Sequence, residues 1–250
     1  MFIANYILVL FAFSMFANNG AFQNINKPPL TQIIEKTEER KDFASLAKNN
    51  KSVIEAYLRF KLALEESNLT QTQIAAILDA ALFSAKKHEH QTRYDSAATP
   101  YIIHPVTVAY SILTIGQVST PEILIAALLH DTVEDTGTTF KEIRQKFGAT
   151  VEGYVKEVTD DRTLSKEKRK ELQLEHAPHK SEGAALIKLA DKLYNVTDVH
   201  HNPAIGWTKE RRDQYVTWAS QVVNQLPTAN KNLKNAMDEA TEKYWSSFND

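Results

Sequence analysis

The ten residues of the segment AALLHDTVED, from Ala126 to Asp135, concentrate more chemically useful side chains than any other stretch of this sequence. In a helix, residues four apart share a face, so His130 is expected beside Glu134 and Asp131 beside Asp135. An imidazole and three carboxylates at such close quarters repel one another and lose hydration unless a positive charge lies among them. A divalent metal ion would supply that charge. The alternative is a capped helix end with solvated acids, which does not usually follow so apolar a run as IAALL.

Two other segments offer side chains of the same kind. His104 lies directly before a proline in TPYIIHP, at the entry to an apolar helix, and Asp191 lies beside the apolar stripe of the helix IKLADKLYNV. Asn195 follows Asp191 by one helical turn on the same side. Taken singly, His104 could cap its helix and Asp191 could pair with a neighbouring lysine. Together with His130-Asp131 they give the order H…HD…D, which is much more specific for a metal site.

The composition limits the classes of protein that this chain can belong to. Its 250 residues, 43% hydrophobic and 24% charged, are typical of one globular domain or one domain with an appendage. A formal net charge of −2 excludes a broad nucleic-acid-binding surface and gives no attraction to anionic membranes. Because the sequence has no cysteine, disulfides, thiolate metal sites and cysteine nucleophiles are excluded. Any metal ion must be held by His, Asp, Glu and water.

The amino terminus predicts a separate targeting segment. Residues 6–16, YILVLFAFSMF, are almost wholly apolar but too few to span a bilayer, which needs roughly 20 apolar residues. Their length suits a signal-peptide core, with cleavage at Ala17 or Ala21, so residues 1–21 are interpreted as a signal peptide. No Lys or Arg precedes the run, and the alternative is a buried helix or a start codon placed too early.

The remainder predicts an all-α fold. Residues 22–68 are interpreted as a linker followed by a helical extension, and residues 69–250 as the main domain. No long alternating stretch predicts a strand, and seven glycines leave little room for hairpins. Capping-box spacing at Thr139–Glu142 and a glycine at 148 bracket one of the helices. Apolar spacing predicts helices near residues 70–88, 150–158, 166–176, 182–199, 208–225 and 228–246.

The order of these residues resembles that of the HD-domain metal-dependent phosphohydrolases. Longer stretches are similar to the small alarmone hydrolases, the hydrolase-only members of the RelA/SpoT homologue superfamily, and particularly to their animal-type Mesh group. The similar stretches are KKHEHQTR, TPYIIHP, AALLHDTVEDT, FGATVEGYVKEVTDD, HAPHKSEGAALIKLADKLYNV and GWTKERRDQYVTWA. The resemblance runs from about Leu69 to about Ala240, and it implies an HD-domain helical bundle to which residues 1–68 do not belong.

The resemblance also implies roles for individual residues. One divalent metal ion, usually manganese, is expected on four ligands, His104, His130, Asp131 and Asp191. Such an ion would lower the pKa of a bound water and neutralise charge at the phosphorus under attack. Glu134 and Asp135 match the family's catalytic acids, which orient that water and handle its proton. Expected substrate contacts are Arg93 along the nucleotide, Asn195 near the sugar or phosphate, Lys166, Arg211 and Tyr215 around the phosphates, and Trp207 at the rim.

The expected activity is removal of the 3′-pyrophosphate from guanosine tetra- or pentaphosphate. The alternatives are a phosphatase acting on a related nucleotide, such as the 2′-phosphate of NADPH or an adenosine alarmone, and an inactive nucleotide-binding sensor. The complete set of ligands and acids argues against the sensor. Two departures from the small alarmone hydrolases that this sequence resembles bear on base preference: Tyr94 stands where they typically have a second basic residue, and Ile103 stands where asparagine is common.

The expected substrate bears on the location of the protein, because alarmones and NADPH are cytoplasmic molecules. Asn195-Val-Thr197 is a formal glycosylation acceptor, and a glycan there would cover an expected substrate contact. A signal peptide would therefore fit a bacterial periplasm better than a glycosylating pathway, and a cytoplasmic location is the alternative. The expected partner is a small-molecule nucleotide, with neither nucleic acid nor a stable membrane span.

Overall fold

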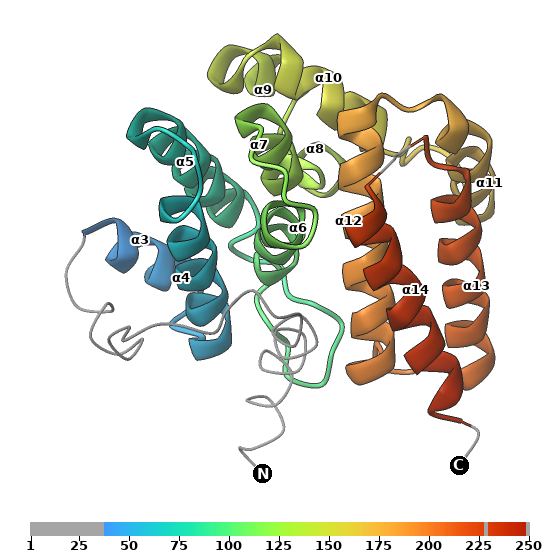
Figure 1. Cartoon of the computed structure of the whole chain (residues 1–250). Helices are drawn as coiled ribbons and strands as arrows, with labels where there is room; N and C mark the ends of the chain where they lie inside the picture. Colours follow the sequence, from blue (N-terminus) through green and yellow to red (C-terminus); the bar gives the residue numbers. More distant parts are fainter. Residues whose placement is uncertain (1–37, 228–229, 249–250) are drawn as a thin grey trace.

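The computed structural model describes residues 38–227 and 230–248, and every regular element in these ranges is a helix (Figure 1). The β-type pairing in the described chain is an isolated bridge between Thr92 and Pro100. The all-α prediction is confirmed. In chain order the helices are α3 (Glu38–Leu46), α4 (Lys51–Glu65), α5 (Gln71–Lys87), α6 (Ile103–Thr114), α7 (Pro121–Leu129), α8 (Thr132–Asp135), α9 (Phe140–Phe147), α10 (Ala149–Val158), α11 (Lys166–His176), the 3-10 turn η1 (Ala177–His179), α12 (Glu182–His201), α13 (Lys209–Gln225) and α14 (Lys231–Ser246).

Short polar side chains begin most of these helices. Thr70 and Gln73 form a reciprocal capping box at α5, and the Thr139 hydroxyl accepts from the Glu142 backbone N–H at α9. Such caps satisfy backbone donors that have no partner in the first turn of a helix. The same type of bond begins five further helices, with Asn50, Ser165, Ser181, Thr208 and Asn230 as the capping residues. Gly148 ends α9 at a φ of 94°, a left-handed conformation that favours glycine.

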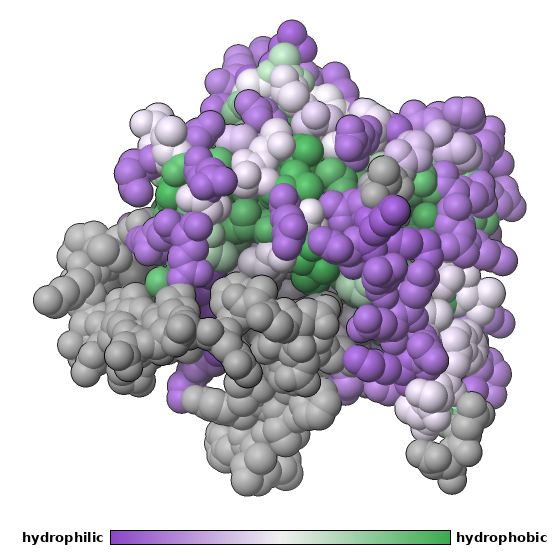
Figure 2. Space-filling view, viewed as in Figure 1, coloured by the Kyte–Doolittle hydropathy of each residue, from purple (hydrophilic) through white to green (hydrophobic). Residues whose placement is uncertain are grey.

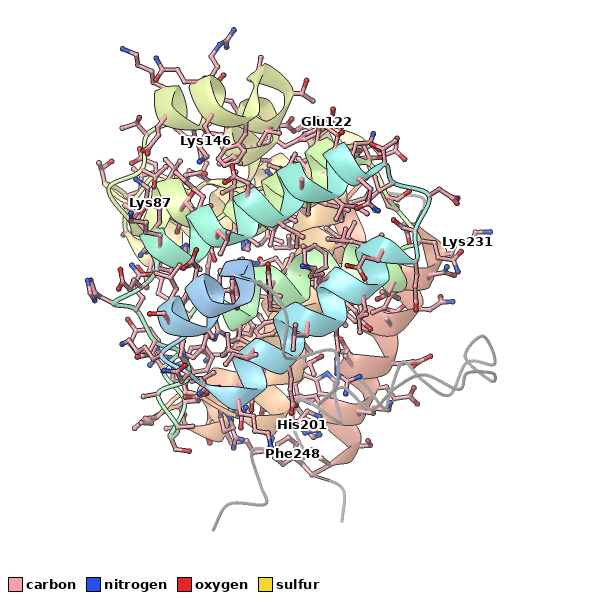
Figure 3. All side chains as sticks on the ribbon, turned by 90° about the vertical axis from the view of Figure 1, so that its left-hand side faces the viewer. Lys87, Glu122, Lys146, His201, Lys231 and Phe248 are labelled. Carbon is pink, nitrogen blue, oxygen red and sulfur yellow. The ribbon has the colours of Figure 1, made fainter. Side chains whose placement is uncertain are left out.

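Helix α12 lies at the centre of the described fold. Helices α6, α13 and α14 pack against it, and α7 packs between α6 and α5. Figure 3 shows α4 and α5 side by side as an outer layer, and α9 and α10 lie above α7 in Figure 1. In Figure 2 the outward face of α14 is strongly polar, while apolar residues gather near the middle of the same view. The chemistry-bearing residues of α6, α7 and α12 are thus brought to one place by the most buried helices.

The helical extension packs on the main domain. Its apolar stripe on α4 is buried, comprising Val53, Ala56, Tyr57, Phe60 and Leu64. The ring of Phe43 on α3 stacks on Tyr57 at 3.9 Å between centroids, and both belong to the same core as the later helices. The predicted signal peptide, residues 1–21, and the linker up to residue 37 lie outside the described residues. Within the described ranges, no helix combines the length and apolarity needed to cross a membrane.

The helix expected across AALLHDTVED is interrupted. Helix α7 ends at Leu129, and His130 and Asp131 form a turn before the single turn of α8. The backbone of Asp131, at φ −98° and ψ −7°, departs from helical values, yet Asp135 N–H still donates to its carbonyl at 2.9 Å. The expected four-residue relation between Asp131 and Asp135 therefore holds, whereas the single continuous helix was wrong.

The glycine that follows α6 provides a test of this packing. A Cβ at Gly116 would lie 2.6 Å from the carbonyl oxygen of Ile112 and 2.9 Å from a methyl group of Leu233, whereas a Cβ at Gly153 in α10 would meet nothing within 4 Å. We expect Gly116→Ala to lower the free energy of unfolding by about 1–3 kcal/mol through overpacking. Gly153→Ala should raise it by about 0.4–1 kcal/mol because the unfolded chain loses freedom. Urea unfolding curves of both variants would measure this, and equal stabilities would contradict it.

Candidate metal centre and nucleotide cleft

Three helices bring the predicted metal ligands together. His104 lies in the first turn of α6, His130 and Asp131 follow α7, and Asp191 lies in the middle of α12. The two Nε2 atoms of the histidines are 3.2 Å apart. An Asp191 oxygen is 3.4 Å from His104 Nε2, and an Asp131 oxygen is 3.2 Å from His130 Nε2. His104, His130 and Asp191 each offer a ligand atom within 4.8 Å of the others, and all three residues are buried.

Hydrogen bonding gives His130 the tautomer of a metal ligand. Its Nδ1 lies 2.8 Å from the carbonyl oxygen of Ala127, so Nδ1 carries the proton and donates. Nε2 of His130 therefore faces Nε2 of His104 and the two carboxylates. Two imidazole nitrogens and two carboxylate oxygens that converge in this way form a donor set that suits a borderline-to-hard divalent cation.

The charges in the cluster also call for a cation. Burial alone would lower the pKa of His130, but Asp131 and Asp191 outweigh burial and raise it to about 9. Burial would raise the pKa of Asp131, yet the two imidazoles hold it well below its usual range. The carboxylates therefore stay ionised and draw positive charge to the ring nitrogens. A divalent ion meets this demand, and the buried cluster fits such an ion.

The two predicted catalytic acids lie beside this cluster on α8. Glu134 accepts from the backbone N–H of Asp160 at 3.0 Å, and its other oxygen is 3.0 Å from Nε of Arg162. The guanidinium of Arg162 also pairs with Asp135. Burial raises the pKa of Glu134, an effect that the Asp160 N–H opposes. A carboxylate whose pKa is raised toward neutrality is suited to exchange a proton.

Tyr101 connects the acids with the metal cluster. Its hydroxyl donates to Asp131 at 2.6 Å and lies 3.4 Å from Asp135. Burial and the Asp131 charge raise the pKa of Tyr101 well above its usual value, so the hydroxyl keeps its proton. The sequence analysis predicted no role for Tyr101, although its position three residues before His104 could have indicated that it lies near the metal ligands.

A cleft of about 770 Å³ lies over the acids and is wide enough for a nucleotide. Its walls include four of the predicted substrate contacts, namely Arg93, Asn195, Trp207 and Tyr215, together with Tyr94, Tyr101, Glu134, Asp135 and Arg162. The backbone N–H of Ile205 donates to Tyr94, which joins the two loops at the mouth of this cleft. Ile103, by contrast, is buried in the core and is absent from the walls of the cleft.

Arg93 is held by other protein groups within the cleft wall. Its guanidinium donates to Asp198 at 2.7 Å and to Asn195 at 3.2 Å, and it lies over the rings of Tyr101 and Tyr194. Asn195 in turn donates to Asp191 at 2.6 Å. The predicted nucleotide contact is thus linked to a predicted metal ligand by an ordered chain of polar groups, in which Asp198 has no role predicted from sequence.

The remaining predicted contacts form a rim of cations on aromatic rings. Arg211 and Lys166 lie over Trp207 at 4.5 Å and 5.9 Å, and Trp207 contacts Tyr215 edge-on. Helix α11 has no buried residue, so the Lys166–Lys170 run is largely an exposed face. Lys166 nevertheless reaches the aromatic wall of the cleft.

The site contains two further cations for which the sequence predicted no role. Arg162 lies in the loop between α10 and α11, and no motif marks it. Lys192 is buried, and its Nζ lies 3.1 Å from the second oxygen of Asp191. The alternative of a lysine partner for Asp191 is therefore also correct: one oxygen faces Lys192 and the other faces the histidines.

Comparisons with known proteins agree with this geometry. The model of the HD domain family matches residues 80–221. The guanosine-3′,5′-bis(diphosphate) 3′-pyrophosphohydrolase MESH1 of Xenopus tropicalis is 51% identical over 164 residues, covering 66% of this chain and 92% of the relative. MESH1 of Homo sapiens is 49% identical over 166 residues, covering 66% and 93%.

A solved structure shows the same similarity in three dimensions. It is described as a metazoan ortholog of SpoT that hydrolyses ppGpp. This structure is 42% identical in sequence, has a TM-score of 0.67, and matches 71% of this chain and 98% of its own. The core of HD-domain helices, the ordered His and Asp ligands and the relatives at about half identity lead to one conclusion: this chain belongs to the HD domain family, in its animal-type Mesh group.

Proposed function

We propose that the chain is a metal-dependent hydrolase that removes the 3′-pyrophosphate from guanosine 3′,5′-bis(diphosphate) and its pentaphosphate analogue. The products are GDP or GTP and diphosphate. The observation that carries the proposal is the cluster of buried His104, His130 and Asp191 with half-buried Asp131, next to the acid pair that lines a nucleotide-sized cleft. The curated relatives of this group carry the same activity in their names.

The reaction consumes one water and breaks the bond between O3′ of the ribose and phosphorus. A new phosphorus–oxygen bond forms from the water oxygen, one proton of the water leaves, and O3′ gains a proton. A divalent ion in the cluster would make the water more acidic and offset negative charge on the phosphate oxygens. We assign manganese as that ion, because the resemblance to the small alarmone hydrolases implies it and the two carboxylate oxygens suit it.

Side chains of the protein carry out the proton transfers and bind the substrate. Glu134 and Asp135 accept and return the proton, and the N–H of Asp160 and the Tyr101 hydroxyl orient them. Arg162, beside both acids, brings positive charge to a cleft that receives a polyanion. Trp207 and Tyr215 offer ring surfaces for the nucleotide, and Lys166 and Arg211 place cations at the rim.

Tyr94 is the reason to consider a second substrate. It lines the cleft with 82% of its surface exposed and offers no charge. An aromatic ring stacks on any base, so adenosine counterparts or NADPH are the alternative substrates at the same site. Export into a periplasm depends on residues 1–21, which lie outside the described residues, and stays a prediction, with the cytoplasm as its alternative.

The metal requirement can be tested by removing ligands. We expect His130→Ala and Asp191→Ala to lose bound metal and hydrolysis together, because each removes a converging donor atom. Metal content measured by plasma mass spectrometry, alongside turnover with added manganese, checks this. His90→Ala is the matched control, since His90 is exposed and outside the cluster. Retained metal and activity in both ligand variants would mean that the site is misplaced.

The acid pair can be separated from metal binding. Glu134→Gln and Asp135→Asn should lower kcat by a factor on the order of 10² to 10⁴, the usual scale of general acid-base catalysis. Metal content and substrate affinity should change much less. Glu142→Gln serves as the control, because Glu142 pairs with Lys87 and does not line the cleft. Full turnover in both acid variants would remove the proton-handling role.

Selectivity can be tested at the mouth of the cleft. Tyr94→Lys should lower KM for guanosine tetraphosphate more than it changes kcat, since an added ground-state charge contact affects binding. It should also sharpen the preference over the adenosine counterpart. Ile205→Lys is the control, because Ile205 is 74% exposed and bonded to Tyr94 but does not line the cleft. An equal fall of KM in both variants would indicate general attraction, and no change would place residue 94 outside the substrate contacts.

A further inference from the structure

A second hollow, of about 430 Å³, lies behind the catalytic acids. It is lined by residues at the end of α10, in α11, in η1 and in α12. Four basic side chains reach its walls, those of Lys156, Arg169, Lys180 and Lys188. The wall shared with the acids contains Asp160 and Arg169, which both contact Glu134. The proposed reaction assigns no role to this hollow.

Two of these cations, Lys180 and Lys188, form no ion pair among the described residues, and Arg169 forms only a long one, with Glu134. Lys188 is 6% exposed, and its Nζ donates to the neutral carbonyl of Val158 at 3.2 Å. Lys180 donates to the backbone carbonyl of Glu157. The Nε of Arg169 is buried without an acceptor in the described chain, and its NH1 is 3.6 Å from Glu134. Buried ammonium and guanidinium groups are normally paired with an anion.

The acids in the wall are bonded to neutral donors instead. Both oxygens of Glu157 accept from Ser181, through the backbone N–H and the hydroxyl, at 2.7 Å each. Asp160 accepts from the side chain of Gln173 at 2.6 Å. Asp161 accepts from Thr163 at 2.9 Å and 2.7 Å. These carboxylates therefore hold loops and helix ends in place and leave the donors of Lys180 and Lys188 directed at neutral oxygens.

Repulsion between the ammonium groups of Lys180 and Lys188 adds to their lack of ion-pair partners. Burial lowers the pKa of Lys180 to about 8, and the ammonium of Lys188 contributes to the same effect. An anion between the two ammonium groups would stabilise the charged form of Lys180. A tetrahedral oxyanion can accept hydrogen bonds from several directions, as the donors of α11 and α12 require.

We propose that this hollow binds a small multivalent phosphate oxyanion, of the class of inorganic phosphate and diphosphate. Lys180 and Lys188 supply the ammonium donors, and Arg169 supplies the guanidinium. The site is distinct from the nucleotide cleft and does not depend on the proposed activity. Because Arg169 also faces Glu134, an anion in the hollow would draw its guanidinium away from the catalytic acid.

Acylation of lysines in the full-length, metal-loaded protein tests the proposal. Near pH 8, Lys180 is partly deprotonated and should react faster with an amine acylating reagent than the exposed Lys141. Inorganic phosphate or diphosphate at ten times its Kd should slow acylation of Lys180 roughly tenfold by mass action, with no change at Lys141. Mass spectrometry of the digested protein gives the rate at each lysine. Protection by diphosphate alone identifies a product of the proposed reaction as the source, and protection by both identifies free phosphate as sufficient.

Two variants complete the design. In Lys188→Met and in Arg169→Gln, with folding checked by circular dichroism, Lys180 should lose this protection while Lys141 remains unchanged. Lys166 reports on the other cleft, since it lies over Trp207 at its rim. Protection of Lys166 without Lys180 would overturn the proposal, because the anion then binds only in the nucleotide cleft. Equal protection of Lys180 in wild type and both variants, or none in any, would overturn it as well.

Discussion

The rest of the structure depends on two carboxylates buried against two imidazoles at the meeting point of α6, α7 and α12. Asp191 and His104 are almost fully buried, and the ionised carboxylates raise the pKa of His130 to about 9. Such a cluster is unfavourable without compensating charge. A protonated His130 supplies part of that charge, and the cluster fits a divalent ion that would supply it in full.

A second set of contacts holds the ligands in orientation. The carbonyl of Ala127 fixes the ring of His130, Tyr101 holds Asp131, and Lys192 and Asn195 hold the two oxygens of Asp191. These partners restrict the rotation of the ligands, so the donor atoms converge before any ion binds. Arg93 continues this chain through Asn195 to Asp198, which connects the cleft with the metal cluster.

The positive charges of the site stand in two groups. Arg162 lies in the nucleotide cleft beside the acids, whereas Lys180 and Lys188 lie in the separate hollow behind them. Glu134 is contacted from both sides, by Arg162 and by Arg169. Because the single turn of α8 lies between the cleft and the hollow, charges in both of them affect the protonation of Glu134.

The sequence by itself predicted the candidate ligands and their order, and it determined the all-α class, because these follow from residue types and from local spacing. Capping residues such as Thr70 and Thr139 also set helix ends locally. The break at His130-Asp131, the placement of Arg162 over the acids and the pairing of Lys192 with Asp191 were decided by the tertiary structure. Arg162 shows the reason: it follows Glu134 by 28 positions with no periodic signal, so only packing of α10 and its loop against α8 brings the two charges together.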